Sequence, residues 1–142
     1  DGLTKAKEEN YDVVFEQNET LGSYVLDGNL LTYDKVPVME NSNTLALKYD
    51  YFKVDALVFK DVKSNKVTLT HRNSSRRVTV DFTGFDVLMF WTKPGAKYIC
   101  IEPWSSHPDN IDSDYDFTKK YHITSLETGE TKENVHTITF EK

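Results

Sequence analysis

The segment Cys100-Ile101-Glu102-Pro103-Trp104 carries a carboxylate inside an apolar run. Alternate side chains of a strand share one face, so Cys100, Glu102 and Trp104 are expected on the same side. A carboxylate between a cysteine and a tryptophan is expected to be partly desolvated, an environment that favours a general base near neutral pH. The alternative is a structural ion pair at the strand end, with a cation such as Lys119. The residues alone leave both interpretations open.

Four side chains besides Glu102 could contact a ligand. Asp55 could accept hydrogen bonds from ligand hydroxyls, or be only a turn residue that begins a strand. Trp91 and Trp104 could stack on a sugar ring, because aromatic faces pack against surfaces rich in C–H groups; for Trp91 a core position is the expected one. His107 follows Glu102 by five residues in a polar loop and could reach the same site.

The histidines and the single cysteine argue against a metal centre. His71, His107, His122 and His136 form no His-x-x-x-His pattern, and Cys100 is the only cysteine. A lone cysteine also excludes an internal disulfide and any cysteine-rich metal site. The sequence has no glycine-rich phosphate loop and no nucleophile elbow. We therefore expect neither a metal nor a cofactor.

Strands are the elements expected to position these side chains. The clearest signal is a hairpin of residues 66–72 and 77–82 around Asn73-Ser74-Ser75, in which apolar and polar residues alternate. Weaker strand signals lie at 11–15, 23–33 around an Asp27-Gly28-Asn29 turn, 44–48, 55–60 and 134–141. No stretch shows a sustained helical stripe, so the predicted fold class is all-β, an antiparallel β-sandwich.

Residues 86–92 are apolar on both faces and predict a strand covered on both sides. Residues 98–104 predict the next strand, which Pro103 ends because it cannot donate to a ladder. Residues 105–120 are polar and predict a long loop with at most one helical turn. One sheet of this chain can cover only one face of 86–92, so we expect an exposed apolar surface that drives self-association or pairing with a missing partner half.

Length and charge narrow the function classes. The 142 residues fit one domain, here the single region 1–142. Seventeen basic against 23 acidic residues give a net charge of −6, which argues against a general nucleic-acid binder. The apolar runs are too short to span a membrane. The single cysteine and the lack of a leader-like opening favour a reduced, cytoplasmic location.

The sequence resembles the aldose 1-epimerase (galactose mutarotase) family, in particular its LacX-like branch. Residues 100–104 resemble the family's catalytic glutamate strand, and 52–59 resemble its aspartate strand. Residues 84–92 resemble the strand before the glutamate, and Leu126 with Gly129-Glu130 resembles the closing turn before the last strand. The likeness covers residues 45–142 well and 1–44 loosely.

The resemblance implies a large β-sandwich of which this chain is the C-terminal half. Members of the family interconvert the α and β anomers of free hexoses without a cofactor. A carboxylate base takes the proton of the C1 hydroxyl, a histidine acid protonates the ring oxygen, and the opened ring recloses as the other anomer. By resemblance Glu102 is the base, Asp55 holds sugar hydroxyls, and Trp104 and Asp109 line the site.

The sequence departs from the family pattern in two respects. The family's acid lies in a His-Pro-x-Phe-type segment upstream of where this chain begins, and its substrate-binding arginine lies further upstream; neither motif is present. Ser106 stands where the family usually has glycine. The chain alone is therefore expected to be inactive. The alternative is a carbohydrate-binding β-sandwich module without turnover.

Overall fold

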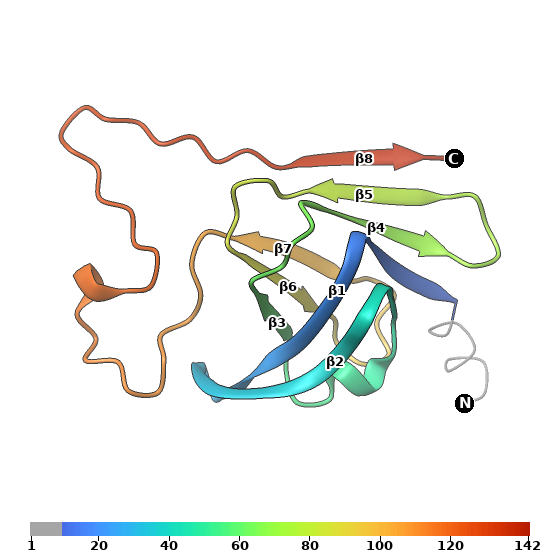
Figure 1. Cartoon of the computed structure of the whole chain (residues 1–142), viewed down its shortest axis with the longest axis horizontal. Coiled ribbons are helices and arrows are strands. Elements are labelled where there is room, and N and C mark those ends of the chain that lie inside the picture. The colour runs from blue at the N-terminus through green and yellow to red at the C-terminus, as the bar shows by residue number, and fades with distance from the viewer. Residues whose placement is uncertain (1–9) are drawn as a thin grey trace.

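The computed structural model describes residues 10–142, which form eight strands in two antiparallel sheets and two single-turn 3-10 helices (Figure 1). The elements are β1 (Tyr11–Asp27), β2 (Leu30–Ala46), η1 (Tyr49–Phe52), β3 (Leu57–Lys60), β4 (Lys66–His71), β5 (Arg77–Asp81), β6 (Val87–Trp91), β7 (Cys100–Trp104), η2 (Phe117–Lys119) and β8 (Thr137–Glu141). The predicted all-β antiparallel sandwich is confirmed.

The two sheets pack face to face around an aromatic core. The larger sheet has the strand order β2-β1-β4-β5-β8, and the smaller has the order β3-β6-β7. Phe90 of β6 lies at the centre, with its ring centroid 6.0 Å from that of Phe59 and 6.4 Å from that of Phe15, both edge to face. All three rings are almost fully buried. Such edge-to-face pairs add about 0.5–1.5 kcal/mol each beyond the area they bury.

Strand β6 of the smaller sheet is covered on both faces. Leu88 and Phe90 point into the core between the sheets, whereas Val87 and Met89 point to the opposite side, and none of the four is more than 6% exposed. On that opposite side they pack beneath side chains of the β1–β2 hairpin, chiefly Leu31, because the hairpin curves across the small sheet (Figure 1). The prediction that this strand is covered on both sides is confirmed. The expectation that one face of residues 86–92 stays exposed is wrong, because residues 87–90 are buried on both faces.

The β1–β2 hairpin is far longer than its sequence signals. Short strand segments were expected at 11–15, on both sides of a turn within 23–33, and at 44–48, but the structure has two strands of 17 residues each. The predicted turn joins them, with Gly28 at φ 58°. Polar residues in the middle of both strands and several register shifts, the largest between Val14 and Glu19, interrupt the alternation that a sequence pattern detects.

Glu19 is the polar residue that the hairpin buries most deeply, at 1% exposure. Its Oε1 accepts hydrogen bonds from the Ser64 backbone N–H at 2.8 Å and the Ser64 hydroxyl at 2.7 Å, and the Lys63 N–H donates to it at 3.2 Å. A buried carboxylate is tolerated when its lone pairs are satisfied in this way. These bonds fasten the loop before β4 to β1.

The C-terminal part of the chain is the least buried. The predicted loop over 105–120 contains one helical turn, η2, as expected. Every residue from 124 to 142 is exposed, and β8 is held by its pairing with β5. Within residues 10–142 no helix is long and apolar enough to cross a bilayer.

Candidate functional site

Glu102 lies on the outer face of the smaller sheet, the side turned away from the larger sheet. It pairs with Met89 of β6, which pairs in turn with Val58 of β3. Cys100 and Trp104 share its face, as strand alternation predicts, and all three are half-buried. The indole N–H of Trp104 donates to Oε2 of Glu102 at 3.0 Å. One carboxylate oxygen is thereby oriented by the protein.

The ion-pair alternative for Glu102 is wrong. Lys119 instead contacts Asp114 at 2.5 Å and Asp116 at 3.4 Å. Across the part of the chain that the structure describes, no lysine or arginine forms a salt bridge with Glu102. Burial raises the pKa of the Cys100 thiol, and the charge and hydrogen bonding of the Glu102 carboxylate raise it further. The thiol is therefore held in its neutral form beside the carboxylate.

Trp91 belongs to this outer face and not to the core, which corrects the expectation for it. It lies opposite Cys100 in the β6–β7 register, is half-buried, and packs against Tyr98 with ring centroids 6.1 Å apart. Trp104 lies at the other end of the same register. The two indoles thus stand on either side of Glu102 along the strands, an arrangement of aromatic, carboxylate and aromatic side chains.

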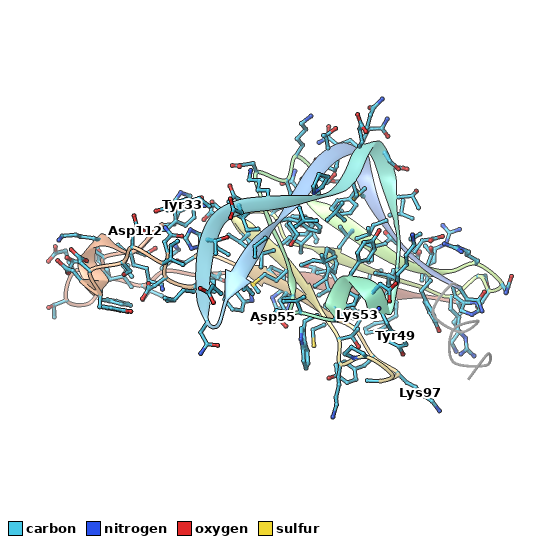
Figure 2. The ribbon with its side chains drawn as sticks, turned by 90° about the horizontal axis from the view of Figure 1, so that it is seen from below. Tyr33, Tyr49, Lys53, Asp55, Lys97 and Asp112 are labelled. Carbon is cyan, nitrogen blue, oxygen red and sulfur yellow. The ribbon has the colours of Figure 1, made fainter. Side chains whose placement is uncertain are left out.

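Asp55 is not part of a strand in the structure, because β3 begins only at Leu57. It is half-buried, and its carboxylate accepts the backbone N–H of Ala56 at 2.7 Å. Strand β6 lies between β3 and the β7 strand that carries Glu102. In Figure 2 Asp55 lies at the lower side of the molecule, well apart from the Tyr33–Asp112 pair. A ligand would have to extend across β6 to meet both carboxylates.

His107 is buried, at 3% exposure, and both of its ring nitrogens are engaged. Nδ1 lies 2.6 Å from the carbonyl oxygen of Pro108, and Nε2 lies 3.2 Å from Nζ of Lys60. Because a carbonyl only accepts, Nδ1 carries the proton, and the Nε2 lone pair accepts from the ammonium. Burial lowers the pKa of His107, and the charges of Lys60 and Lys120 lower it further against the opposing effect of the Pro108 bond.

Lys60 organises a cluster that the sequence did not reveal. Its ammonium lies 4.3 Å from the ring centroid of Tyr121 and 5.0 Å from that of Tyr24, and Tyr121 stacks on His107 at 4.2 Å. We call Tyr24, Lys60, His107 and Tyr121 the Lys60 cluster. Cation–π contacts of this kind contribute about 0.5–2 kcal/mol each. The four residues come from four separate segments, so no local spacing signals them.

Asp109 is tied into the loop that follows Trp104. Its Oδ1 lies 2.7 Å from Nζ of Lys120, and its carbonyl oxygen accepts the Leu31 N–H at 2.8 Å. It lines a polar cavity of about 250 Å³ together with Asp112. The Tyr33 hydroxyl donates to Asp112 at 2.8 Å, and this bond raises the pKa of Tyr33 (Figure 2). The loop is thus fixed to the tip of the β1–β2 hairpin.

A larger cavity, about 460 Å³, includes none of the predicted site residues. Its lining combines aromatic side chains, among them Tyr11, Tyr49, His71 and Tyr98, with aliphatic and lysine side chains. Ile99, which also lines it, points into the core side of the small sheet and so away from the face of Glu102. Within residues 10–142 no three histidine, cysteine or acidic side chains are placed to hold a metal ion.

Comparison with known proteins gives two kinds of relative. No family model matches the chain. Two LacX proteins of Lactococcus lactis subsp. lactis, one chromosomal and one plasmid-borne, are each 31% identical over 137 residues, covering 94% of this chain and 46% of the relative. The chain therefore spans about half the length of the curated relatives it matches.

Two crystal structures share the fold. A galactose mutarotase-like protein from Lactobacillus casei superposes with a TM-score of 0.82 at 22% identity, over 94% of this chain and 47% of that one. A galactose mutarotase related enzyme from Lactobacillus acidophilus gives a TM-score of 0.84 at 25% identity, over 95% and 46%. The resemblance noted in the sequence is confirmed at the level of both sequence and fold.

Proposed function

Because the chain is aldose 1-epimerase-like, related to LacX in sequence and galactose mutarotase-like in fold, we propose that it supplies the base side of a hexose-binding epimerase site. The observation that carries the proposal is the outer-face arrangement of Trp91, Glu102 and Trp104. Indole faces suit the C–H surfaces of a sugar ring, and an unpaired carboxylate between them can accept a hydroxyl proton.

The contacts of Glu102 define its proposed role. The Trp104 N–H occupies Oε2 and fixes the plane of the carboxylate, which leaves Oε1 to accept the proton of the sugar C1 hydroxyl. When that proton is removed and the ring oxygen is protonated, the ring C–O bond breaks and C1 becomes a carbonyl that can be reclosed from either face. Asp55 and Asp109 are proposed to accept other sugar hydroxyls.

The acid must be a different group from His107. Its Nδ1–H donates a hydrogen bond to the Pro108 carbonyl, and its Nε2 lone pair accepts one from the Lys60 ammonium. Neither nitrogen therefore offers a proton to a sugar. We assign His107 to positioning the loop after Trp104. The proton donor is proposed to lie in the portion of the relatives' length that this chain does not span, which makes the chain one half of a catalytic unit. The free thiol of Cys100 beside the base suits a reduced, cytoplasmic setting.

A carbohydrate-binding module without turnover is the second candidate. The same aromatic and carboxylate side chains would bind a sugar there, with no proton donor opposite Glu102. The two proposals differ in whether anomers interconvert once the remaining length of the relatives is supplied.

Titration of the chain with galactose and glucose tests the shared part of both proposals. We expect perturbation of the Trp91 and Trp104 indole N–H signals in two-dimensional NMR, and no acceleration of mutarotation in polarimetry. A Trp91→Ala variant should lose the binding, whereas Glu133→Gln, in the exposed segment 124–142, should not. Sugar binding that leaves the N–H signals of both indoles unchanged would contradict the proposed site. Polarimetry on a protein of the relatives' full length then separates an epimerase from a module.

A further inference from the structure

Residues 105–123 form a strap that projects from the sandwich after β7 (Figure 1). Its first limb, 105–108, and its return limb, 119–122, lie against each other, because the Ser106 hydroxyl donates to the carbonyl oxygen of Tyr121 at 2.6 Å. Both limbs contribute to the Lys60 cluster. This cluster fastens the strap to the end of β3.

A second attachment ties the middle of the strap to the β1–β2 hairpin. The Leu31 N–H donates to the carbonyl oxygen of Asp109 at 2.8 Å, and the Ile111 N–H donates to that of Leu31 at 3.1 Å. These backbone bonds do not titrate. The contact of His107 with Lys60 does, because the imidazole accepts from the ammonium only while Nε2 carries no proton. The two attachments therefore differ in their response to acid.

The surroundings of His107 favour its neutral form. Both ring nitrogens are engaged, and within residues 10–142 no carboxylate forms an ion pair with this imidazole. The titratable and charged groups around it come from every element packed there: Lys60 of β3, Tyr24 of β1, Lys35 of β2 over Tyr24, Lys120, Tyr121 and His122 of the return limb, Asp109 of the strap, and Asp61 and Asp86 near Tyr121. Lys120 already holds Asp109 at 2.7 Å. An imidazolium would therefore point an N–H at an ammonium, with no free acid beside it.

The return limb carries a second histidine that responds in the opposite sense. Nδ1 of His122 lies 2.8 Å from Oδ2 of Asp86, just before β6, and its ring stacks on Tyr121 with centroids 4.0 Å apart. Protonation turns this hydrogen bond into an ion pair, and charge-assisted bonds are stronger than neutral ones. Acid therefore strengthens the hold of Asp86 on the return limb while it breaks the hold of Lys60 on His107.

We propose that the strap is a pH-sensitive latch, in which protonation of His107 releases the first limb from Lys60. Asp86 and Leu31 keep the return limb and the middle of the strap in place. His107 is only 3% exposed, and every residue that buries and contacts it in this arrangement belongs to this chain. The latch is thus complete within the described residues and does not depend on an open edge or an uncovered surface.

The position of the first limb gives the latch its consequence for the site. This limb joins Trp104, whose N–H orients Glu102, to Asp109. Release of the limb should therefore weaken the binding of a sugar between these side chains. This consequence rests on the proposed function, whereas the latch itself does not.

NMR of the isotope-labelled chain between about pH 8 and pH 5 tests the latch without any sugar. At the higher pH the His107 ring should show the Nδ1–H tautomer, and it should titrate below the exposed His136. The amide signals of 105–108 should change with the same midpoint as the His107 ring. Those of Leu31 and Ile111 should not follow it. Protonation of His107 that leaves the 105–108 amides unchanged would overturn the proposal.

Three variants and a matched control test the cause. His107→Gln should abolish the change at 105–108, and the control His136→Gln should leave it. Lys60→Gln removes the cation but keeps a hydrogen-bond donor, so the His107 midpoint should rise by about one pH unit. His122→Gln should let acid release both limbs. An amide change that persists in His107→Gln, or a midpoint that Lys60→Gln does not raise, would contradict the latch.

Galactose titrations at the two pH values separate the latch from the sugar site. We expect the affinity of the unmodified chain to fall severalfold in acid, and that of His107→Gln to fall less. A latch that opens in NMR while no sugar binds at either pH would contradict the proposed function and leave the latch intact. Sugar binding with no release of the first limb would do the reverse.

Discussion

The ammonium nitrogen of Lys60 lies 3.2 Å from Nε2 of His107. A cation at this distance is compatible only with a neutral imidazole, since an imidazolium would have no lone pair to offer. The contact joins the end of β3 to the loop that follows β7. The loop carrying Ser106 and Asp109 therefore depends on the protonation state of one buried histidine.

Stability should fall when His107 is protonated. Its pKa is lowered in the folded state by burial and by neighbouring cations, so between that value and about 6.5 the unfolded chain binds more protons than the folded chain. The contribution of His107 to the free energy of unfolding is then complete above about pH 6.5, and it is lost as the pH falls through the folded-state pKa. Urea denaturation at about pH 7.5 and pH 5 measures the difference. The difference should shrink in His107→Gln and remain in the exposed His136→Gln control; an unchanged pH dependence in His107→Gln would contradict the assignment.

Removing the buried carboxylate of Glu19 should destabilise the fold strongly. Glu19→Ala leaves the Ser64 N–H and hydroxyl without their acceptor in a buried setting, and we expect a loss of about 2–5 kcal/mol. Glu16 is a matched control, because its carboxylate also accepts two backbone N–H groups, from Asn65 at 2.7 Å and Lys66 at 3.1 Å, but it is exposed. Glu16→Ala should cost less than about 1.5 kcal/mol. Chemical denaturation of both variants tests the order, and equal losses would contradict it.

The turn of the long hairpin depends on backbone conformation at one residue. Gly28 has φ 58°, and a Cβ added there meets no atom within 4 Å, so the cost of a side chain is purely local strain. Gly28→Ala should lower the free energy of unfolding by about 1–2 kcal/mol. Gly28→Asn should lower it less, because asparagine tolerates the left-handed region better than alanine. Thermal denaturation of the two variants gives the comparison, and a smaller loss for alanine would be the contrary result.

Glu102→Gln should separate sugar binding from turnover in a protein of the relatives' full length. The amide keeps the shape of the side chain and a hydrogen-bonding oxygen, but it cannot hold the C1 proton. We expect kcat to fall by about 10²–10⁴-fold, as for the loss of a positioned general base, with little change in sugar affinity. Glu133→Gln is the control for surface charge. Near-normal mutarotation by Glu102→Gln would show that another group is the base.

The strands whose alternation is continuous were predictable from sequence. The hairpin of β4 and β5, the doubly covered β6 and the Glu102 strand β7 lie where the pattern put them, within one or two residues at the ends. The long hairpin was not predictable, because Glu19 is buried by partners 45 residues away and looks like a surface residue in the sequence. A local sequence pattern cannot show that a polar side chain will be hydrogen-bonded by a distant loop.

The candidate site was predictable in part for the same reason. Strand alternation places Cys100, Glu102 and Trp104 on one face from spacing alone. Lys60 and His107 are 47 residues apart in the sequence, and the residues around neither of them predict the contact. Trp91 was expected in the core because its strand is apolar throughout, but its position at the end of β6 leaves it beyond the cover of the β1–β2 hairpin.

The pairing of β1 with β4 has a consequence for how fast the chain can fold. Arg72, just after β4, donates a hydrogen bond to Asp12 of β1, which is 60 residues away in the sequence. The pairing of β5 with β8 likewise joins segments that are far apart in the sequence. The pairs β1–β2, β4–β5 and β6–β7 join strands that are neighbours in sequence, and each remaining strand pair requires a longer segment to be closed first. This high contact order predicts folding in about milliseconds to seconds, with the hairpins of sequence-adjacent strands the earliest structures available to nucleate it.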